Sequence, residues 1–290
     1  MKLRAYAKIN LGLDVLRKRN DGYHDLEMVM QSVSLYDELE INLINSGFEI
    51  SCSNSAIPLD HNNLICKTGL AVQKYTGNDF GFRVHLVKNI PFGAGLGGGS
   101  ADAAATLIAL NNLLDLSLSP DELIPIGKSI GADVPFCLLG GTRFAQGIGE
   151  ILAPIDAYSS YYIVLAKPEV NISTASVFQK LSLDMDNIHP SIRLLKEDVR
   201  CSDLTIFTSH MGNYLSSVTE TDYPIIRNIR KHLDDCGAAI SLMSGSGPTV
   251  FGIFDNKEKA QYANEGCKKL FALDCCTVTA PVNMGVEIIH

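Results

Sequence analysis

A run of glycines followed by a run of alanines, in the stretch Pro91–Ala105, constrains the fold of this chain more than any other feature. Its sequence, PFGAGLGGGSADAAA, places five glycines within seven positions and continues into an apolar segment that ends near Leu114. Folded chains concentrate glycine where the backbone needs a positive φ or a close approach, and a segment that is apolar on most sides predicts a buried helix. The first turn of such a helix offers unpaired N–H groups and the positive end of the helix dipole, so the stretch predicts a site for an anion, most often a phosphate. The alternative is a flexible loop capped by Ser100, but flexible loops rarely lead straight into a buried helix.

Two common phosphate-binding motifs fit this chain poorly. The P-loop pattern fails because Gly127-Lys128-Ser129 has Glu122 where the first glycine should stand. Residues 93–98 fit G-x-G-x-x-G, but a dinucleotide-binding unit also needs an acidic residue about 20 positions on, at the end of a second strand. Asp115 lies near that distance but follows a helical run, and Pro91 breaks the strand before the glycines. The context therefore argues against a nicotinamide-dependent oxidoreductase.

Composition is that of an ordinary soluble globular protein. The 290 residues allow about two domains, and 46% of them are hydrophobic and 19% charged. The net charge is −8 without a basic block, which makes nucleic acid or an anionic membrane surface an unlikely partner. We expect no signal peptide and no membrane span, because no apolar run reaches about 18 residues. The eight cysteines form no C-x-x-C pair, so the expectation is reduced thiols in a cytoplasm.

The N-terminal half reads as strands and capped helices. Residues 2–14 alternate strictly, with Leu3, Ala5, Ala7, Ile9, Leu11 and Leu13 on one face, which predicts a half-buried strand that projects Lys8 and Asn10 from the other. The segment Gly131–Pro135 is tight and presents one carboxylate, Asp133, which local sequence alone favours as a turn residue. The other elements expected here are a turn at 20–22, strands at 26–35 and 39–43 with a break at 36–38, a helix from Asn62 or Asn63 to about 75, a strand at 82–87, a helix at about 120–130 behind a capping box, and a hairpin of 142–146 with 150–154.

The C-terminal half predicts a second α/β unit. Without its extra helices, the order of its elements is βαββαβ, that of a ferredoxin-like fold. Its two middle strands flank Ser244-Gly245-Ser246-Gly247-Pro248, which is either a plain connector or a loop whose N–H groups face another phosphate. The expected elements are strands at 161–166, 239–243, 249–254 and 275–281, and helices capped by Ser173 or Thr174 and at about 192–197, 203–217, 224–236 and 257–271.

The glycine stretch resembles the ATP-binding loop of the GHMP kinases, the superfamily of galactokinase, homoserine kinase and mevalonate kinase. The N-terminal strand with Lys8 and the loop 244–248 line up with the same superfamily. Ala7–Leu11, Arg19–His24 and Gly131–Pro135 resemble the branch whose members phosphorylate a cytidine diphosphate-linked methylerythritol. The resemblance runs through the whole chain. It implies a two-domain α+β fold, with a ribosomal-S5-like ATP-binding domain at 1–157 and a ferredoxin-like domain at 158–290.

The resemblance also implies a reaction. ATP would give its γ-phosphoryl group to the 2-hydroxyl of the methylerythritol moiety, in the non-mevalonate route to isoprenoids. Asp133 would be the general base, Lys8 would pair with it and neutralise charge at the hydroxyl, and Asn10 would orient the same region. Tyr23, His24 and Phe178 would hold the cytidine end, where an aromatic pair can sandwich the base.

The remaining binding roles follow from the same resemblance. The phosphates of ATP would lie against Pro91, Gly93, Ala94, Gly95, Leu96, Gly97, Gly98, Gly99, Ser100 and Ala101. Asn63, Leu64 and Lys67 would lie near adenine, and Ser244, Gly245, Ser246 and Gly247 would bind the acceptor. ATP chemistry requires Mg²⁺, which often keeps its waters and takes few protein ligands; Ser100 is the residue placed to touch it.

Two alternatives remain open from the sequence. One is another small-molecule kinase, of homoserine or mevalonate type, against which Tyr23, His24 and Phe178 argue. The other is a non-catalytic, ligand-sensing relative, against which the presence of both Lys8 and Asp133 argues. We expect a cytoplasmic enzyme with a small-molecule substrate, as a monomer or weak homodimer.

Overall fold

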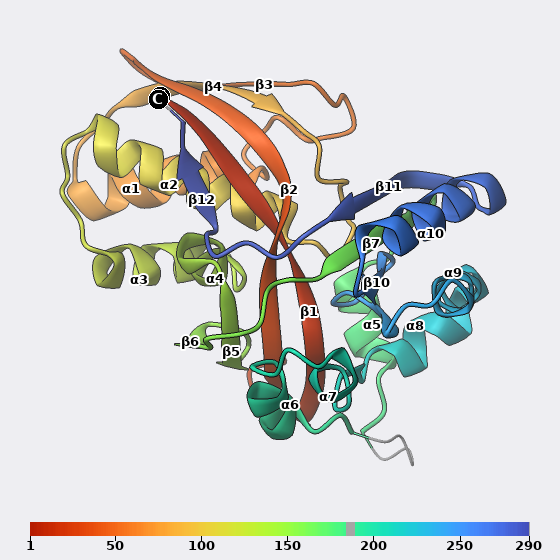
Figure 1. The fold of residues 1–290 in the computed structure, drawn as a ribbon. Helices are drawn as coiled ribbons and strands as arrows, with labels where there is room; N and C mark the ends of the chain where they lie inside the picture. Colours follow the sequence, from red (N-terminus) through yellow and green to blue (C-terminus); the bar gives the residue numbers. More distant parts are fainter. Residues whose placement is uncertain (184–188, 290) are drawn as a thin grey trace.

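Two sheets, each with its own helices, make up the computed structural model, which describes residues 1–183 and 189–289 (Figure 1). The first sheet has eight strands, with a central order β12-β1-β2-β4-β3; β5 pairs with β2 and β6, and β8 pairs with β1. The second sheet has four strands in the order β11-β7-β10-β9. Two long antiparallel strands, β1 (Lys2–Lys18) and β2 (His24–Ile44), run through the middle of the molecule and separate the two groups of helices (Figure 1).

Strand β1 is buried on both faces, which corrects the expected half-buried strand. Every residue from 5 to 15 is buried. The expected single apolar face is also wrong, because the pairing with β2 shifts register between Tyr6 and Ala7 and again between Asn10 and Gly12. Such irregularities re-aim the side chains between them. The six apolar residues consequently divide between two hydrophobic clusters: Leu3, Ala5 and Leu13 pack in the cluster that includes α2 and α4, and Ala7, Ile9 and Leu11 pack against the second sheet.

Strand β2 is continuous where the sequence predicted two strands. The expected break at 36–38 lies inside β2, and the register shift places Tyr6 opposite Tyr36 but Ala7 opposite Val33. The strand therefore absorbs its extra residues as a bulge without ending. The flanking strands are β3 (Phe48–Cys52), which the sequence did not predict, β4 (Gly81–Val87), and the expected hairpin of β5 (Thr142–Gly147) and β6 (Ile151–Pro154).

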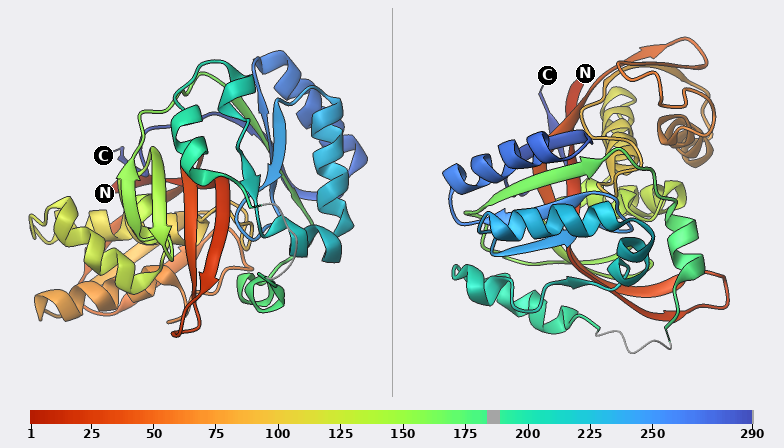
Figure 2. Two further views of the ribbon diagram at one scale, coloured as in Figure 1. Left: turned by 90° about the horizontal axis from the view of Figure 1, so that it is seen from below. Right: turned by 90° about the vertical axis from the view of Figure 1, so that its right-hand side faces the viewer.

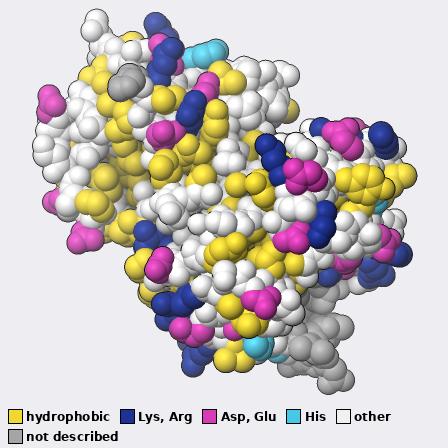
Figure 3. Space-filling view, in the orientation of Figure 1, with side chains coloured by type: hydrophobic (Ala, Val, Ile, Leu, Met, Phe, Trp, Pro, Cys, Tyr) yellow, Lys and Arg dark blue, Asp and Glu magenta, His cyan; other side chains and the backbone are white. Residues whose placement is uncertain are grey.

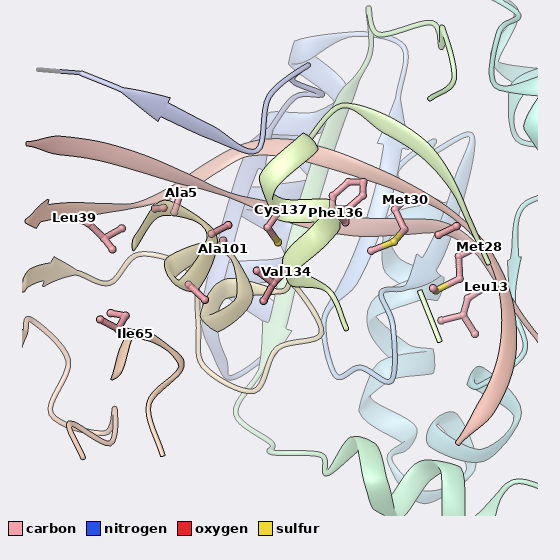
Figure 4. Close-up of a cluster of buried hydrophobic side chains, with 14 of the residues drawn as sticks. Ala5, Leu13, Met28, Met30, Leu39, Ile65, Ala101, Val134, Phe136 and Cys137 are labelled. Atoms are coloured by element: carbon pink, nitrogen blue, oxygen red, sulfur yellow. The ribbon is translucent and has the colours of Figure 1, made fainter. Parts of the chain in front are cut away.

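Four helices cover one side of the first sheet. The predicted helix α1 (Leu64–Thr76) begins at Asn63, whose side chain accepts from the Ile65 N–H, and ends at Gly77. The helix after the glycine loop is α2 (Gly98–Leu113), and it is buried as expected. It is followed by α3 (Pro120–Ile130) and by α4 (Val134–Leu139), a short helix that the sequence did not predict. Ala101 of α2 and Val134, Phe136 and Cys137 of α4 belong to one buried cluster with residues of β1 and β2 (Figure 4).

The second sheet has the ferredoxin-like order that the sequence predicted. The last strand of the unit, β11 (Leu273–Thr279), lies at one edge beside the first, β7 (Tyr162–Pro168), and then come β10 (Val250–Phe254) and β9 (Ile240–Met243), all antiparallel. Helices α9 (Pro224–Asp235) and α10 (Lys257–Leu270) lie side by side along this sheet (Figure 2). The shorter α5 (Thr174–Lys180) begins at Ser173, as expected.

The predicted helix at 203–217 is wrong. After α6 (Ile192–Asp198), the chain forms a short helix, α7 (Leu204–Phe207), then the strand β8 (Gly212–Asn213) and the helix α8 (Ser216–Asp222). The Asn213 side chain donates to the carbonyls of Met243 and Gly245, both at 2.7 Å, and accepts from the Leu215 N–H. These bonds compete with a helical path through Asn213.

The chain returns to the first sheet at two late points. β8 pairs in parallel with β1, and β12 (Val286–Ile288), which the sequence did not predict, pairs antiparallel with β1 at the edge. The face in Figure 3 mixes basic and acidic side chains and shows no continuous basic patch. All eight cysteines are free, and within the described residues no helix is both long and apolar enough to cross a membrane.

Candidate active site

The glycine loop lies between β4 and the buried helix α2, as the sequence predicted. Its backbone takes positive φ at Gly93, Gly95 and Gly97, with values of 62°, 73° and 71°. A Cβ on Gly95 would stand 2.3 Å from the carbonyl oxygen of Ser244, so only glycine allows this close approach. The dinucleotide-binding alternative is wrong, because β4 pairs antiparallel with β2 and Asp115 follows α2 instead of ending a strand.

Lys8 and Asp133 come together beside this loop. The Lys8 ammonium lies 3.5 Å from Asp133 Oδ2 and donates to Asn10 Oδ1 at 2.8 Å. The Lys8 N–H donates to the Leu96 carbonyl at 2.9 Å, which ties β1 to the loop. A Cβ on Gly97 would stand 3.0 Å from Lys8 Cγ, so the start of α2 packs directly on the lysine stem. The arrangement places a cation and a carboxylate next to a potential phosphate cradle.

Asp133 occupies the residue that precedes α4, the N-cap position of that helix. The Asp133 carbonyl accepts from the Cys137 N–H at 3.1 Å, while no hydrogen bond from the helix ties down the carboxylate. Its side chain is 33% exposed, whereas that of Lys8 is only 6% exposed. The Asp133 carboxylate is therefore accessible to a ligand from solvent, while the buried Lys8 ammonium contacts it from the protein interior.

The loop Ser244–Pro248 packs on the glycine loop. The Ser244 hydroxyl donates to the Gly95 carbonyl at 3.0 Å, and Ser244 is fully buried. The Ser246 hydroxyl lies 2.8 Å from that of Thr174, the first residue of α5. The N–H groups of Ser244 and Gly247 already donate to carbonyls of the same turn. Any anion at this loop would therefore approach the N–H groups of Gly245 and Ser246.

The expected aromatic residues gather at the end of the β1–β2 hairpin and on α5. The rings of His24 and Phe178 stack with centroids 5.0 Å apart and an interplanar angle of 27°. Burial lowers the pKa of His24, and the nearby Lys18 charge adds to this effect. Tyr23 is 61% exposed. A base between two rings needs about 7 Å between them, so the His24–Phe178 stack leaves no room for one.

The remaining predicted residues lie around the same loop. Asn63 uses its side chain in the cap of α1, where it also donates to the Pro58 carbonyl at 2.7 Å, and Lys67 is exposed one turn later. Ser100 lies half-buried in the first turn of α2. In the described part of the chain no group of three acidic, histidine or cysteine side chains could hold a metal ion. A single hydroxyl beside a phosphate cradle fits Mg²⁺ that is bound mainly by phosphate oxygens and water.

The sequence interpretation missed a buried ionic cluster below the loop. Lys88 Nζ lies 2.5 Å from Asp37 Oδ2 and 2.6 Å from Asp102 Oδ2. Burial raises the pKa of Asp102 to about 8, against the lowering effect of Lys88. One signal was available, because Asp102 is the one charged residue in a helix of mostly apolar residues.

Comparisons with known proteins agree with this geometry. The family model for the GHMP kinases N terminal domain matches residues 63–141, and the model for the GHMP kinases C terminal matches residues 191–271. Curated relatives named 4-diphosphocytidyl-2-C-methyl-D-erythritol kinase include one from Clostridium kluyveri, 43% identical over 92% of this chain and 96% of its own length. One from Acetivibrio thermocellus is 42% identical over 92% of this chain and 95% of its own length.

Solved structures show the same fold. A crystal structure of 4-(cytidine 5'-diphospho)-2C-methyl-D-erythritol kinase has a TM-score of 0.81 at 29% identity, and the match covers 97% of this chain and 99% of that one. A homoserine kinase from Cytophaga hutchinsonii has a TM-score of 0.80 at 21% identity, covering 100% and 97%. The second likeness supports the fold alone.

Proposed function

Since the chain belongs to the GHMP kinases, and within them to the 4-diphosphocytidyl-2-C-methyl-D-erythritol kinases, we propose that it transfers the γ-phosphoryl group of ATP to the 2-hydroxyl of 4-diphosphocytidyl-2-C-methyl-D-erythritol. The products are ADP and the 2-phosphate, in the non-mevalonate route to isoprenoid precursors. The observation that carries the proposal is the Lys8–Asp133 pair, 3.5 Å apart beside the glycine loop. Homoserine and mevalonate kinases have less support, because five solved structures with these names are 13–21% identical to this chain.

Asp133 and Lys8 are the proposed catalytic residues. Phosphoryl transfer depends mostly on positioning and on stabilisation of charge. Asp133 would accept the hydrogen bond of the 2-hydroxyl, orient its oxygen toward the γ-phosphorus, and take its proton late in the transfer. Lys8 would neutralise charge that develops on that oxygen, and its bond to Asn10 Oδ1 at 2.8 Å supports a fixed direction for the ammonium.

The glycine loop is the proposed ATP site. The N–H groups of residues 95–100 would wrap the β- and γ-phosphates at the start of α2, where the helix dipole favours negative charge. The expected contribution of the Ala101 N–H is corrected, because that group already donates to the Gly97 carbonyl at 2.9 Å. Pro91, Gly93 and Ala94 would form the entry to this cradle, and Asn63 and Lys67 on α1 would lie near adenine. Ser100 would contact Mg²⁺, which when bound neutralises phosphate charge.

The cytidine end of the acceptor would lie at Tyr23, His24 and Phe178. Because His24 and Phe178 stack on each other at 5.0 Å, a sandwiched cytosine would need Tyr23 as one of its faces. The N–H groups of Gly245 and Ser246, in the loop Ser244–Gly247, would bind the anionic part of the acceptor.

We also propose the domain boundaries, the cellular location and the oligomeric state. Residues 1–157 would form the ATP-binding domain and 158–290 the second domain, in a cytoplasmic protein that is a monomer or weak homodimer and binds no nucleic acid. Size-exclusion chromatography with light scattering would measure the oligomeric state.

Phosphorylation by the purified protein tests the function. With ATP and Mg²⁺, we expect turnover of 4-diphosphocytidyl-2-C-methyl-D-erythritol and none of homoserine or mevalonate. Turnover of either alternative acceptor in place of the cytidyl compound would reassign the substrate. Binding of ATP without turnover of any of the three would favour the ligand-sensing alternative.

A further inference from the structure

Three ionisable side chains lie buried below the glycine loop. The side chains of Lys88, Asp37 and Asp102 are 3%, 0% and 6% exposed. Lys88 Nζ bridges the two carboxylates, at 2.5 Å from Asp37 Oδ2 and 2.6 Å from Asp102 Oδ2. None of the three takes part in the proposed chemistry, so their presence in the interior needs another explanation.

The cluster contacts both ends of the loop. At the entry, Asp37 Oδ1 accepts from the N–H groups of Asn89 at 2.6 Å and Ile90 at 2.8 Å, directly before Pro91. At the exit, Asp102 belongs to the second turn of α2. Lys88 joins the two carboxylates, so a single network spans the loop from one end to the other.

The ammonium of this network also lies directly under the start of α2. A Cβ on Gly98, the first residue of that helix, would stand 3.0 Å from Lys88 Nζ and 2.9 Å from Ile90 Cγ2. The position of Lys88 therefore limits how closely the first turn of α2 can approach the entry strand. The N–H groups of that turn are the ones that would face the phosphates.

Stability alone does not account for the cluster. Apolar residues of similar volume often stabilise a core as well as a buried ion pair does. Here Asp102 Oδ1 is buried and has no hydrogen-bond partner among the described residues, which adds a desolvation cost. A costly polar network that connects the two ends of a ligand-binding loop is better explained by the geometry it maintains.

We propose that Lys88, Asp37 and Asp102 form a clamp of positioning residues, which holds the two ends of the glycine loop at the separation that binds the triphosphate of ATP. The inference rests on the proposed function, because it takes ATP as the phosphoryl donor. The clamp acts through the loop backbone and does not touch the reacting atoms. Loss of the clamp should therefore weaken binding of the nucleotide and leave binding of the acceptor unchanged.

The variant Asp102→Ala tests the exit contact of the clamp, because it leaves Lys88 and Asp37 as a neutral pair. We expect the KM for ATP and the Kd of ADP, measured by calorimetry without acceptor, to rise about tenfold, as expected when a preorganised loop is loosened. The KM for the acceptor should stay within about twofold. Asp102→Asn, which keeps an oxygen for Lys88, should restore most of the nucleotide affinity.

Asp274→Ala is a control at a distant site, because it removes the partly exposed carboxylate partner of another buried lysine, Lys167, in the second sheet. It should lower stability without raising the KM for ATP. If Asp102→Ala does not fold, Asp37→Asn provides the same test, because it keeps the acceptor for Asn89 and Ile90 while weakening the contact with Lys88.

Three results would overturn the clamp: nucleotide affinity unchanged in the folded variant, an equal rise in the KM for the acceptor, or the same rise in Asp274→Ala. The calorimetric measurement separates this inference from the proposed function. Weaker ADP binding in Asp102→Ala, together with no acceptor turnover by the unmodified protein, would support the clamp and refute the function.

Discussion

Replacement of Asp133 by asparagine is the sharpest test of the active site, because the structure predicts a large effect on rate and a small one on stability. The carboxylate is 33% exposed and lies 3.5 Å from Lys8 Nζ, and such partly exposed pairs contribute at most about 1 kcal/mol to the free energy of unfolding. In the variant, Lys8 keeps its bond to Asn10 Oδ1 at 2.8 Å. The protein should therefore remain folded.

The expected loss of rate is that of a general base. A well-placed acid–base group contributes about 100-fold to 10,000-fold, so kcat of Asp133→Asn should fall by at least about 100-fold while the KM for ATP changes little. The assay is steady-state ADP release with 4-diphosphocytidyl-2-C-methyl-D-erythritol as acceptor. Asp203→Asn makes the same chemical change at the N-cap of α7 and should leave kcat unchanged.

Lys8→Met completes the test as a double-mutant cycle. If Lys8 and Asp133 act as one unit, the double variant should be no slower than the slower single variant, because groups that act together are not additive. Additive losses would mean that the two residues act separately. Near-normal kcat in either single variant would refute the assignment of both.

Three further predictions concern Gly95, Phe178 and Asp102. Gly95→Ala would combine a positive φ with a Cβ 2.3 Å from the Ser244 carbonyl oxygen. In urea unfolding it should therefore lower the free energy of unfolding by more than Gly77→Ala, for which we expect roughly 1 kcal/mol because its added Cβ would contact nothing. Equal losses of stability would contradict the packing of the two loops. Phe178→Ala should raise the KM for the cytidyl acceptor by about fivefold to 100-fold, since stacking contributes roughly 1–3 kcal/mol per base; an unchanged KM would remove Phe178 from the site. Burial raises the pKa of Asp102 to about 8, against about 3.9 in an unfolded chain, so between these values the unfolded state loses this proton and the free energy of unfolding falls as pH rises, by at most about 1.4 kcal/mol per pH unit. In urea unfolding, Asp102→Asn should therefore gain stability relative to the unmodified protein over that pH range. Parallel pH profiles of the two proteins would refute the raised pKa.

Local chemistry explains why the glycine loop was predictable. Positive φ at Gly95 and Gly97 and the start of α2 depend on residues that are neighbours in the sequence. Capping chemistry likewise placed the ends of α1 at Asn63 and Gly77. The proximity of Lys8 to Asp133 depends on tertiary structure, and only the family resemblance brought them together; local sequence alone favoured Asp133 as a turn residue.

Non-local pairing explains most of what the sequence did not predict. Strands β8 and β12 have two and three residues, too few to show the alternation that identifies a strand. Both form because they pair with β1, the first strand of the chain, which is distant from them in sequence. The predicted helix at 203–217 was wrong for a related reason, because Asn213 bonds to the carbonyls of Met243, at the end of β9, and of Gly245, in the loop that follows it.

Strand β1 shows how an unbroken sequence pattern can conceal a functional site. The alternation of residues 2–14 correctly predicted that Lys8 and Asn10 share a side, but it did not predict the two register shifts that bracket them. Those shifts send Ala7, Ile9 and Leu11 to the second sheet, which leaves Lys8 and Asn10 directed toward the loop and α4. Since this side of β1 is covered, its polar groups need partners there, and Lys8 meets that need with Asn10 and Asp133. The same irregularity that hides the lysine from solvent thus aims it at the carboxylate, so an alternating polar side of a strand can line a site as well as face water.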